Sequence, residues 1–267
     1  MLRDITLGQY YPGESLIHRL DPRVKIIATF IFIIELFLID ELIQYIWVLL
    51  FLTIVITASK VPVKFMFKGL RPLMIIIILT FSINIFMTKG ELLYALGPLK
   101  ITREGLHQAI FMGGRLIILI IGSSVLTLTT KPIKLTDGIE KLLNPFKRIG
   151  VPAHELAMMM SIALRFIPTL LEETDKIMKA QMARGADFES GNLINRAKSL
   201  IPLLVPLFIS AFRRADELAM AMEARCYRGG ENRTRMHELS YHKKDLLALM
   251  FTIMFLGIII YHRFFWI

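Results

Sequence analysis

Hydrophobic residues in this chain gather into runs that are separated by short polar segments. Each run is close to or shorter than the roughly 20 apolar residues that a helix needs to cross a bilayer, and its flanks can extend it. The first two runs are separated only by Asp40 and Glu41, which predicts a helical hairpin with an acidic turn. The pattern predicts an all-α integral membrane protein with about five transmembrane helices, at Val24–Ile39, Leu42–Ala58, Leu73–Met87, Ala109–Thr129 and Leu246–Tyr261.

The stretch between the fourth and fifth runs is more polar but still periodic, which indicates helices and not disorder. A short amphipathic helix is predicted over Lys131–Phe146, and the Gly-Val-Pro sequence that starts at Gly150 ends it. A long helix is predicted from His154 to Arg184, with a kink at Pro168 because proline cannot donate the backbone hydrogen bond of the helix.

A second long helix is predicted after the loop at 186–199, with Pro202 in its first turn. It continues through Arg225 and is expected to run on toward Gly229 and Gly230. Both long helices begin with apolar residues and end with charged ones. We therefore expect both to lean from the bilayer interior toward the cytosol.

The charge distribution predicts the orientation in the membrane. The chain has 267 residues, of which 55% are hydrophobic, and a net charge of +10; its mean hydropathy is +0.57. A basic chain can bind nucleic acid, but in a membrane protein an excess of Lys and Arg marks cytoplasmic segments, and we favour that interpretation. It places the N-terminus inside and the C-terminus outside, with three parts: helices 1 to 4 in 1–130, a cytoplasmic region in 131–243 and the last helix in 244–267.

Motifs for catalysis or metal binding are missing from the sequence. It contains no Walker loop, no H-E-x-x-H and no paired C-x-x-C, and its six histidines are scattered. Its one cysteine excludes an internal disulfide. No cleavable signal peptide is apparent. We expect no cofactor, no metal site and no catalysis by this chain alone.

Two ionisable residues fall inside predicted membrane helices. Glu35 lies in the first and Arg115 in the fourth, both in the outer half of the bilayer. Charged groups there are costly and often functional, so one interpretation is a substrate or proton pathway. One acid and one base do not make a relay, and we favour a structural role: a Glu35–Arg115 pair, or an Arg115 side chain that snorkels toward the outer headgroups.

A short pattern occurs twice, once at the predicted end of each long helix: Ala183-Arg184-Gly185 and Ala224-Arg225-Cys226. An arginine in a last helical turn complements the helix dipole, and glycine is the commonest residue just after a helix. Cysteine is poorly suited to the left-handed backbone of that position, so a simple helix end does not account for the second copy. What the copies share is an exposed arginine between small residues, which favours docking into a partner.

These triplets give the chain a family resemblance. The N-terminal stretch Gly8–Gly13, the segment His18–Lys25 and the sequence Met222–Arg225 followed by Tyr227 add to it. Together they resemble the transmembrane T component of energy-coupling factor (ECF) transporters. The one departure is Cys226, where that family usually has glycine, and it suggests that the residue is needed for its small size more than for backbone freedom.

The resemblance implies a coupling function in a prokaryotic cell membrane. A T component joins two ATP-binding-cassette (ABC) ATPases to a small membrane protein, the S component, which captures a vitamin or metal ion. The two long helices would be coupling helices, and Arg184 and Arg225 would each seat in a groove of one ATPase. No nucleic acid partner is implied.

Methionines on the long helices could give an adaptable surface for the S component. The candidates are Met158, Met159, Met160 and Met220; alternatively, they fill the protein core or face lipid. The main rival function is a self-sufficient secondary transporter or channel. That class typically has inverted repeats or broken helices with polar groups near the midplane, and the sequence shows neither.

Overall fold

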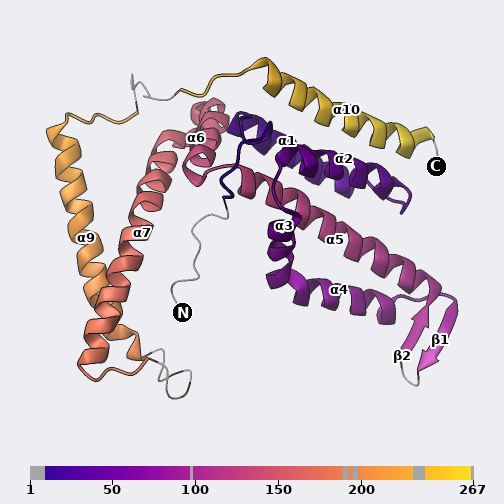
Figure 1. Ribbon diagram of the computed structural model, residues 1–267, viewed down its shortest axis with the longest axis horizontal. Helices are drawn as coiled ribbons and strands as arrows, with labels where there is room; N and C mark the ends of the chain where they lie inside the picture. The colour runs from indigo at the N-terminus through magenta and orange to yellow at the C-terminus, as the bar shows by residue number, and fades with distance from the viewer. Residues whose placement is uncertain are drawn as a thin grey trace. The chain divides into compact units, whose positions relative to one another are not determined.

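The structure is a computed structural model, and it describes residues 10–96, 99–188, 192, 194, 198–230 and 238–265. It confirms the all-α membrane fold, with one two-stranded hairpin in the described part (Figure 1). The elements in chain order are α1 (Pro22–Phe37), α2 (Gln44–Ser59), α3 (Val63–Leu70), η2 (Arg71–Leu73), α4 (Met74–Met87), β1 (Leu92–Leu96), β2 (Leu99–Thr102), α5 (Arg103–Thr129), α6 (Pro132–Leu143), η3 (Asn144–Ile149), α7 (Ala153–Ala183), α9 (Ile201–Ala224) and α10 (Lys243–Phe265). Gly8 and Gln9 of the family-like N-terminal stretch, and parts of the 186–199 loop, lie outside the described residues.

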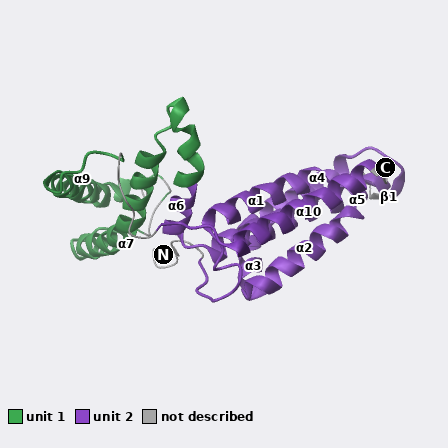
Figure 2. Ribbon diagram, turned by 90° about the horizontal axis from the view of Figure 1, so that it is seen from above, with its two compact units in different colours: residues 1–7, 140–237 green, residues 8–139, 238–267 purple. Residues whose placement is uncertain are grey.

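The chain divides into two compact units (Figure 2). The membrane unit comprises residues 8–139 and 238–267, and the hairpin unit comprises residues 140–237. In the membrane unit, α1 contacts both α5 and α10, and α4 lies along α5.

Local sequence signals set the ends of the membrane-unit helices. Pro22 occupies the first turn of α1, and the side chain of Asp21 accepts a hydrogen bond from the Arg23 backbone N–H at 2.8 Å, which caps the helix. Thr102 caps α5 in the same way, since its hydroxyl accepts from the Gly105 N–H at 3.0 Å. At the start of both helices, a capping side chain thus satisfies a backbone N–H group that has no partner within the helix.

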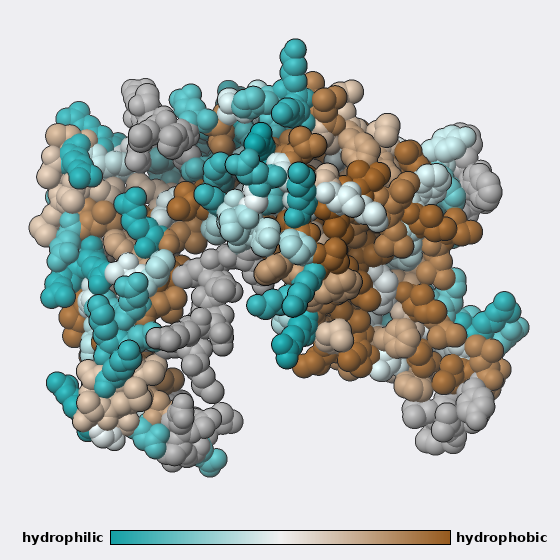
Figure 3. All heavy atoms as spheres, in the orientation of Figure 1, coloured by the Kyte–Doolittle hydropathy of each residue, from teal (hydrophilic) through white to brown (hydrophobic). Residues whose placement is uncertain are grey.

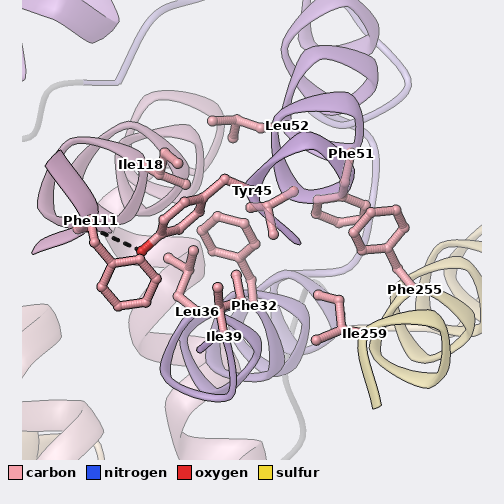
Figure 4. Packing of buried hydrophobic residues seen from close by; sticks show 11 residues of the cluster. Phe32, Leu36, Ile39, Tyr45, Phe51, Leu52, Phe111, Ile118, Phe255 and Ile259 are labelled. Carbon is pink, nitrogen blue, oxygen red and sulfur yellow. Dashed lines mark hydrogen bonds between the residues drawn. The ribbon is translucent and has the colours of Figure 1, made fainter. Parts of the chain in front are cut away.

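Aromatic side chains from four helices form the core of the membrane unit (Figure 4). The Phe51 ring lies 5.9 Å from that of Phe32 and 4.8 Å from that of Phe255, measured between centroids. The Tyr45 hydroxyl donates to the Phe111 carbonyl at 3.1 Å, so this buried polar group is satisfied. The core therefore ties α1, α2, α5 and α10 together.

Large apolar side chains also cover the outside of the membrane unit. Ile75 and Met87 on α4 are both more than three-quarters exposed, and Phe30 on α1 is two-thirds exposed. Figure 3 shows hydrophobic residues, in brown, gathered over α4 and α5. Apolar exposure on this scale fits a hydrocarbon surrounding and not water.

Four helical stretches in the described residues are long and apolar enough to cross a membrane: Val63–Met87, Arg103–Thr129, Ala153–Ala183 and Lys243–Phe264. Three of them contain predicted transmembrane runs. The fourth is α7, which the sequence placed in the cytoplasmic region. In contrast, α1 and α2 have 16 residues each, about 24 Å at 1.5 Å per residue, and so are shorter than a typical ~30 Å hydrocarbon core.

Two elements were not predicted. The short helix α3 precedes α4, and the loop at 88–105 contains an antiparallel pair of strands, β1 and β2. Both are short and carry Lys or Glu beside their apolar residues, so neither shows the long periodic pattern from which sequence analysis recognises an element.

Helices α7 and α9 form an antiparallel hairpin, which contradicts the expectation that both lean the same way from the bilayer. Gln181 near the end of α7 donates to the Pro202 carbonyl at the start of α9, at 3.5 Å. Further along, the Glu173 carboxylate accepts a hydrogen bond from the Ser210 hydroxyl. It also accepts one from the Arg214 guanidinium, at 2.7 Å. These contacts pair the apolar start of each helix with the charged end of the other, and they account for the direction.

Candidate functional site

The first triplet ends α7 in a defined backbone turn. Arg184 is the last residue with near-helical backbone, and Gly185 follows with φ +88°. The Gly185 N–H donates to the Met182 carbonyl at 3.0 Å, and the Ala186 N–H donates to the Gln181 carbonyl at 2.9 Å. This pair of bonds is a Schellman motif, which satisfies carbonyls that a helix end leaves free.

The second triplet ends α9 in the same motif. The Cys226 N–H donates to the Glu223 carbonyl at 2.8 Å, and the Tyr227 N–H donates to the Met222 carbonyl at 3.0 Å. Cys226 has φ +57° and therefore adopts the left-handed conformation. The expectation that α9 runs on toward Gly229 and Gly230 is wrong, because Cys226 occupies the left-handed position for which cysteine was judged poorly suited.

The correction has a physical reason. A non-glycine residue in the left-handed region costs about 1–2 kcal/mol. Two backbone hydrogen bonds at the helix end, each worth about 0.5–1.5 kcal/mol net, offset that cost. The residue after each arginine thus has a left-handed backbone in both copies, whether it is glycine or cysteine.

Both arginines are available to a partner. Arg184 and Arg225 are exposed, as are the other residues of the two triplets. Within the described residues, neither guanidinium has a hydrogen bond or an ion pair. Each cap arginine therefore presents an unpaired planar fork of donors, which suits carboxylates and carbonyl oxygens.

The antiparallel pairing puts the two triplets at opposite ends of the hairpin. Arg184 lies where α7 ends, whereas the chain just after Arg225 returns to the start of α7, where the Tyr227 hydroxyl lies 3.5 Å from His154 Nε2. The 31 residues of α7 span about 46 Å at 1.5 Å per residue. The two arginines are therefore too far apart to enter one compact groove.

Polar side chains contact one another beside the end of α9 that carries Arg225. Besides contacting Tyr227, His154 approaches Glu140 through its other ring nitrogen, at 3.1 Å between Nδ1 and Oε1. Gly230 also lies against this ring, because an added Cβ there would come within 2.4 Å of His154 Cδ2. Sequence reasoning missed this group since its members are far apart along the chain and none belongs to a recognisable motif.

The predicted Glu35–Arg115 pair is not formed. Arg115 donates to the Ile39 carbonyl at 2.7 Å and lies over the Phe111 ring, with its guanidinium carbon 4.7 Å from the ring centroid. Glu35 is completely buried, and neither of its carboxylate oxygens has a hydrogen-bond partner among the described residues. The reason is that carbonyls just after the end of α1 lack helical partners, so Ile39 offers the arginine an acceptor.

The described residues hold no group of three or more His, Cys, Asp and Glu side chains that could bind a metal ion. The candidate site consists of the two helix ends that carry Arg184 and Arg225.

Comparison with known proteins identifies the family. Residues 13–236 match the CbiQ family, described as cobalt transport protein. A protein of Thermosediminibacter oceani is 63% identical over 265 residues, covering 99% of this chain and 100% of the relative. Relatives from Clostridium kluyveri and Bacillus subtilis are 59% and 49% identical, over 100% and 98% of this chain and 99% and 100% of their own lengths. All three are named energy-coupling factor transporter transmembrane protein EcfT.

The chain belongs to the CbiQ/EcfT family. It is a membrane protein and the transmembrane component of an ECF transporter. The family resemblance inferred from the twin triplets is thereby confirmed.

The four methionines predicted to form a surface for the S component differ in solvent exposure. Met159 and Met220 are more than half exposed, whereas Met158 and Met160 are half-buried. The antiparallel register places Met220 and the three α7 methionines toward the same end of the hairpin. Contact between these residues and an S component stays a prediction.

The left-handed cap positions of this EcfT chain predict opposite effects of two substitutions. Gly185→Ala introduces a Cβ at φ +88°, so we expect it to destabilise the end of α7 by about 1 kcal/mol. Cys226→Gly removes the same strain at φ +57°, and we expect it to raise thermal stability without loss of transport. Thermal unfolding of the detergent-purified chain measures both changes, and a lower midpoint for Cys226→Gly would contradict the assignment.

Proposed function

We propose that the α7–α9 hairpin couples two ABC ATPases to a substrate-binding S component. Arg184 binds a groove of one ATPase and Arg225 binds a groove of the other. ATP hydrolysis takes place in those partners, and this chain is not catalytic. The S component selects the transported vitamin or metal ion.

The observation that carries the proposal is the pair of like-built helix ends. Each presents an exposed arginine without a partner among the described residues, at a helix end closed by the same two backbone hydrogen bonds. Their placement at opposite ends of one hairpin fits two ATPase subunits side by side, each reached by one end.

The hairpin is built to transmit displacement between those ends. Glu173 contacts both Ser210 and Arg214 across the two helices, so movement of one helix along the other breaks a partly buried ion pair. Pro168 and Pro206 interrupt the helical hydrogen-bond pattern within α7 and α9. When the ATPases close, the hairpin is displaced as a unit and bends at these prolines. We propose that this motion tilts the S component between outward-facing and inward-facing orientations.

Charge within the membrane unit supports a cytoplasmic N-terminus and an external C-terminus. Lys25 at the start of α1 and Lys244 at the start of α10 line the same cavity as Thr129 at the end of α5. These helix ends therefore lie at one end of the unit, which is rich in lysine. The opposite end carries the Asp40–Arg263 ion pair at 2.9 Å. By the positive-inside rule, the lysine-rich end faces the cytosol.

Purification of the tagged chain from its native cells tests the proposed assembly. We expect two ATPase subunits and one S component per chain, measured by native mass spectrometry. A chain that transports substrate alone, in liposomes without ATPases, would contradict the proposal and favour a secondary transporter.

A further inference from the structure

The membrane unit contains a cavity of about 430 Å³ among α1, α2, α5 and α10. A volume of that size lies within the range of ligand pockets in proteins. Its lining is almost entirely aliphatic and aromatic, with Val24, Ala28, Val55 and Val125 among the side chains that form it. Neither Arg184, Arg225 nor any other residue of the α7–α9 hairpin lines this cavity.

The cavity has a charged end and an aromatic end. Lys25 and Lys244 line it at the starts of α1 and α10, and Phe32 and Phe51 line it deeper in the unit. Lys25 and Phe32 are seven residues apart on one helix, a rise of about 10 Å. The cavity is thus an apolar slot with cations at one end.

The slot also reaches the outer surface. Leu16 and Leu247 line it, yet each is about two-thirds exposed. In a membrane protein, an apolar opening among exposed leucines adjoins lipid chains and not water. Molecules of the bilayer therefore have direct access to it.

Among the described residues, the Lys25 ammonium forms no ion pair with a carboxylate, although Asp21 and Asp245 lie near it. Lys25 is buried, and its ammonium donates to the carbonyls of His18 and Thr129 and to the Thr130 hydroxyl, at 3.0–3.3 Å. These acceptors are neutral, and a buried cation is stabilised when an anion lies nearby.

The nearest acidic side chains are already engaged. The Asp21 carboxylate accepts from the Arg23 guanidinium at 2.8 and 3.0 Å. The Asp245 carboxylate accepts from the backbone N–H groups of Asp21 and His242 at 2.7 and 2.8 Å. With Asp21 paired to Arg23, the single charge of Asp245 does not balance Lys25, Lys134 and Lys244. An anionic group from outside the chain therefore complements the excess positive charge at this end.

We propose that this cavity binds one acyl chain of an anionic phospholipid from the surrounding bilayer, with the phosphate beside Lys25 and Lys244. The chain fills the apolar slot toward Phe32 and Phe51, and burial of its methylene groups drives binding. The phosphate complements the two lysines, as anionic headgroups do for basic clusters at the cytoplasmic surface.

Native mass spectrometry of the full-length chain, released from vesicles of equal phosphatidylglycerol and phosphatidylcholine, tests the proposal. We expect one retained phospholipid, with phosphatidylglycerol preferred. Ala248→Trp places an indole in the cavity and should abolish retention. Leu246→Trp, on the exposed side of the same helix, is the matched control and should retain the lipid.

Charge variants test the headgroup contact without disturbing a buried residue. Lys244 is exposed, so Lys244→Gln should fold normally and reduce the preference for phosphatidylglycerol roughly fivefold. Its control is Lys243→Gln, since Lys243 is exposed and does not line the cavity. Thermal unfolding of each variant verifies the fold.

Three results would overturn the inference. They are absence of retained lipid in the wild-type chain, unchanged retention in a folded Ala248→Trp variant, and equal retention of the two lipids by the wild type. A cross-link from Ala248→Cys to a partner polypeptide in the assembled transporter, with no lipid retained, would also overturn it and assign the cavity to a protein segment.

Discussion

The Arg184→Ala, Arg225→Ala double variant is expected to abolish coupled uptake while inserting normally into the membrane. A central arginine at an interface commonly contributes about 2–4 kcal/mol, which at 1.4 kcal/mol per tenfold change weakens each docking contact about 30-fold to several hundred-fold. Because the two ends bind separate ATPases in our proposal, each single variant should lose one contact and the double variant both. ATP hydrolysis and substrate uptake by the reconstituted complex measure the effect.

Two other cations serve as controls for the loss of charge. Arg213 and Lys176 are exposed on α9 and α7, away from the helix ends. Their alanine variants should retain ATPase binding and uptake. Wild-type coupling in the double arginine variant would refute the docking proposal, and equal loss in the two controls would show that net charge matters and not position.

Gly105→Ala is expected to disrupt the packing of α4 against α5. A Cβ at Gly105 would lie 2.8 Å from the Ile85 carbonyl oxygen and 3.0 Å from that of Asn84, both on α4. It would also come within 2.7 Å of the Thr102 hydroxyl, which caps α5. Backbone oxygens cannot rotate away, so we expect a loss of about 1–3 kcal/mol from overpacking, with a further loss of about 1 kcal/mol if the cap is displaced.

Gly114 on the same helix is the matched control, since an added Cβ there meets nothing within 4 Å. Thermal unfolding and size-exclusion chromatography in detergent measure both variants. Equal stability of Gly105→Ala and Gly114→Ala would show that the α4–α5 contact tolerates a wider spacing than the structure has.

Sequence analysis located α7 and the start of α9 well because proline and glycine mark those ends. It placed the first long helix at His154–Arg184, and the structure has α7 at Ala153–Ala183. The direction of α9 against α7 could not be predicted in this way. It depends on contacts such as Glu173 with Arg214, which join residues 41 positions apart, and no local pattern reports them.

The position of the two arginines at helix ends was predicted from the repeated triplet, and their docking role stays a prediction. The conformation of Cys226 was misjudged because a residue preference is a weak guide where backbone hydrogen bonds compete with it. The Glu35–Arg115 pair failed for a related reason. Opposite charges in neighbouring helices suggested a pair, whereas the arginine bonds to a carbonyl at a helix end.

The two ends of the α7–α9 hairpin have the same backbone hydrogen bonds but different side-chain contacts around them. The Arg225 end lies beside His154 and its contact with Glu140, whereas the Arg184 end is held through Gln181 and Pro202. The two arginines of this chain thus have different surroundings. Under our proposal, even two identical ATPase subunits would be mechanically inequivalent, and one ATP site would meet a stiffer load than the other.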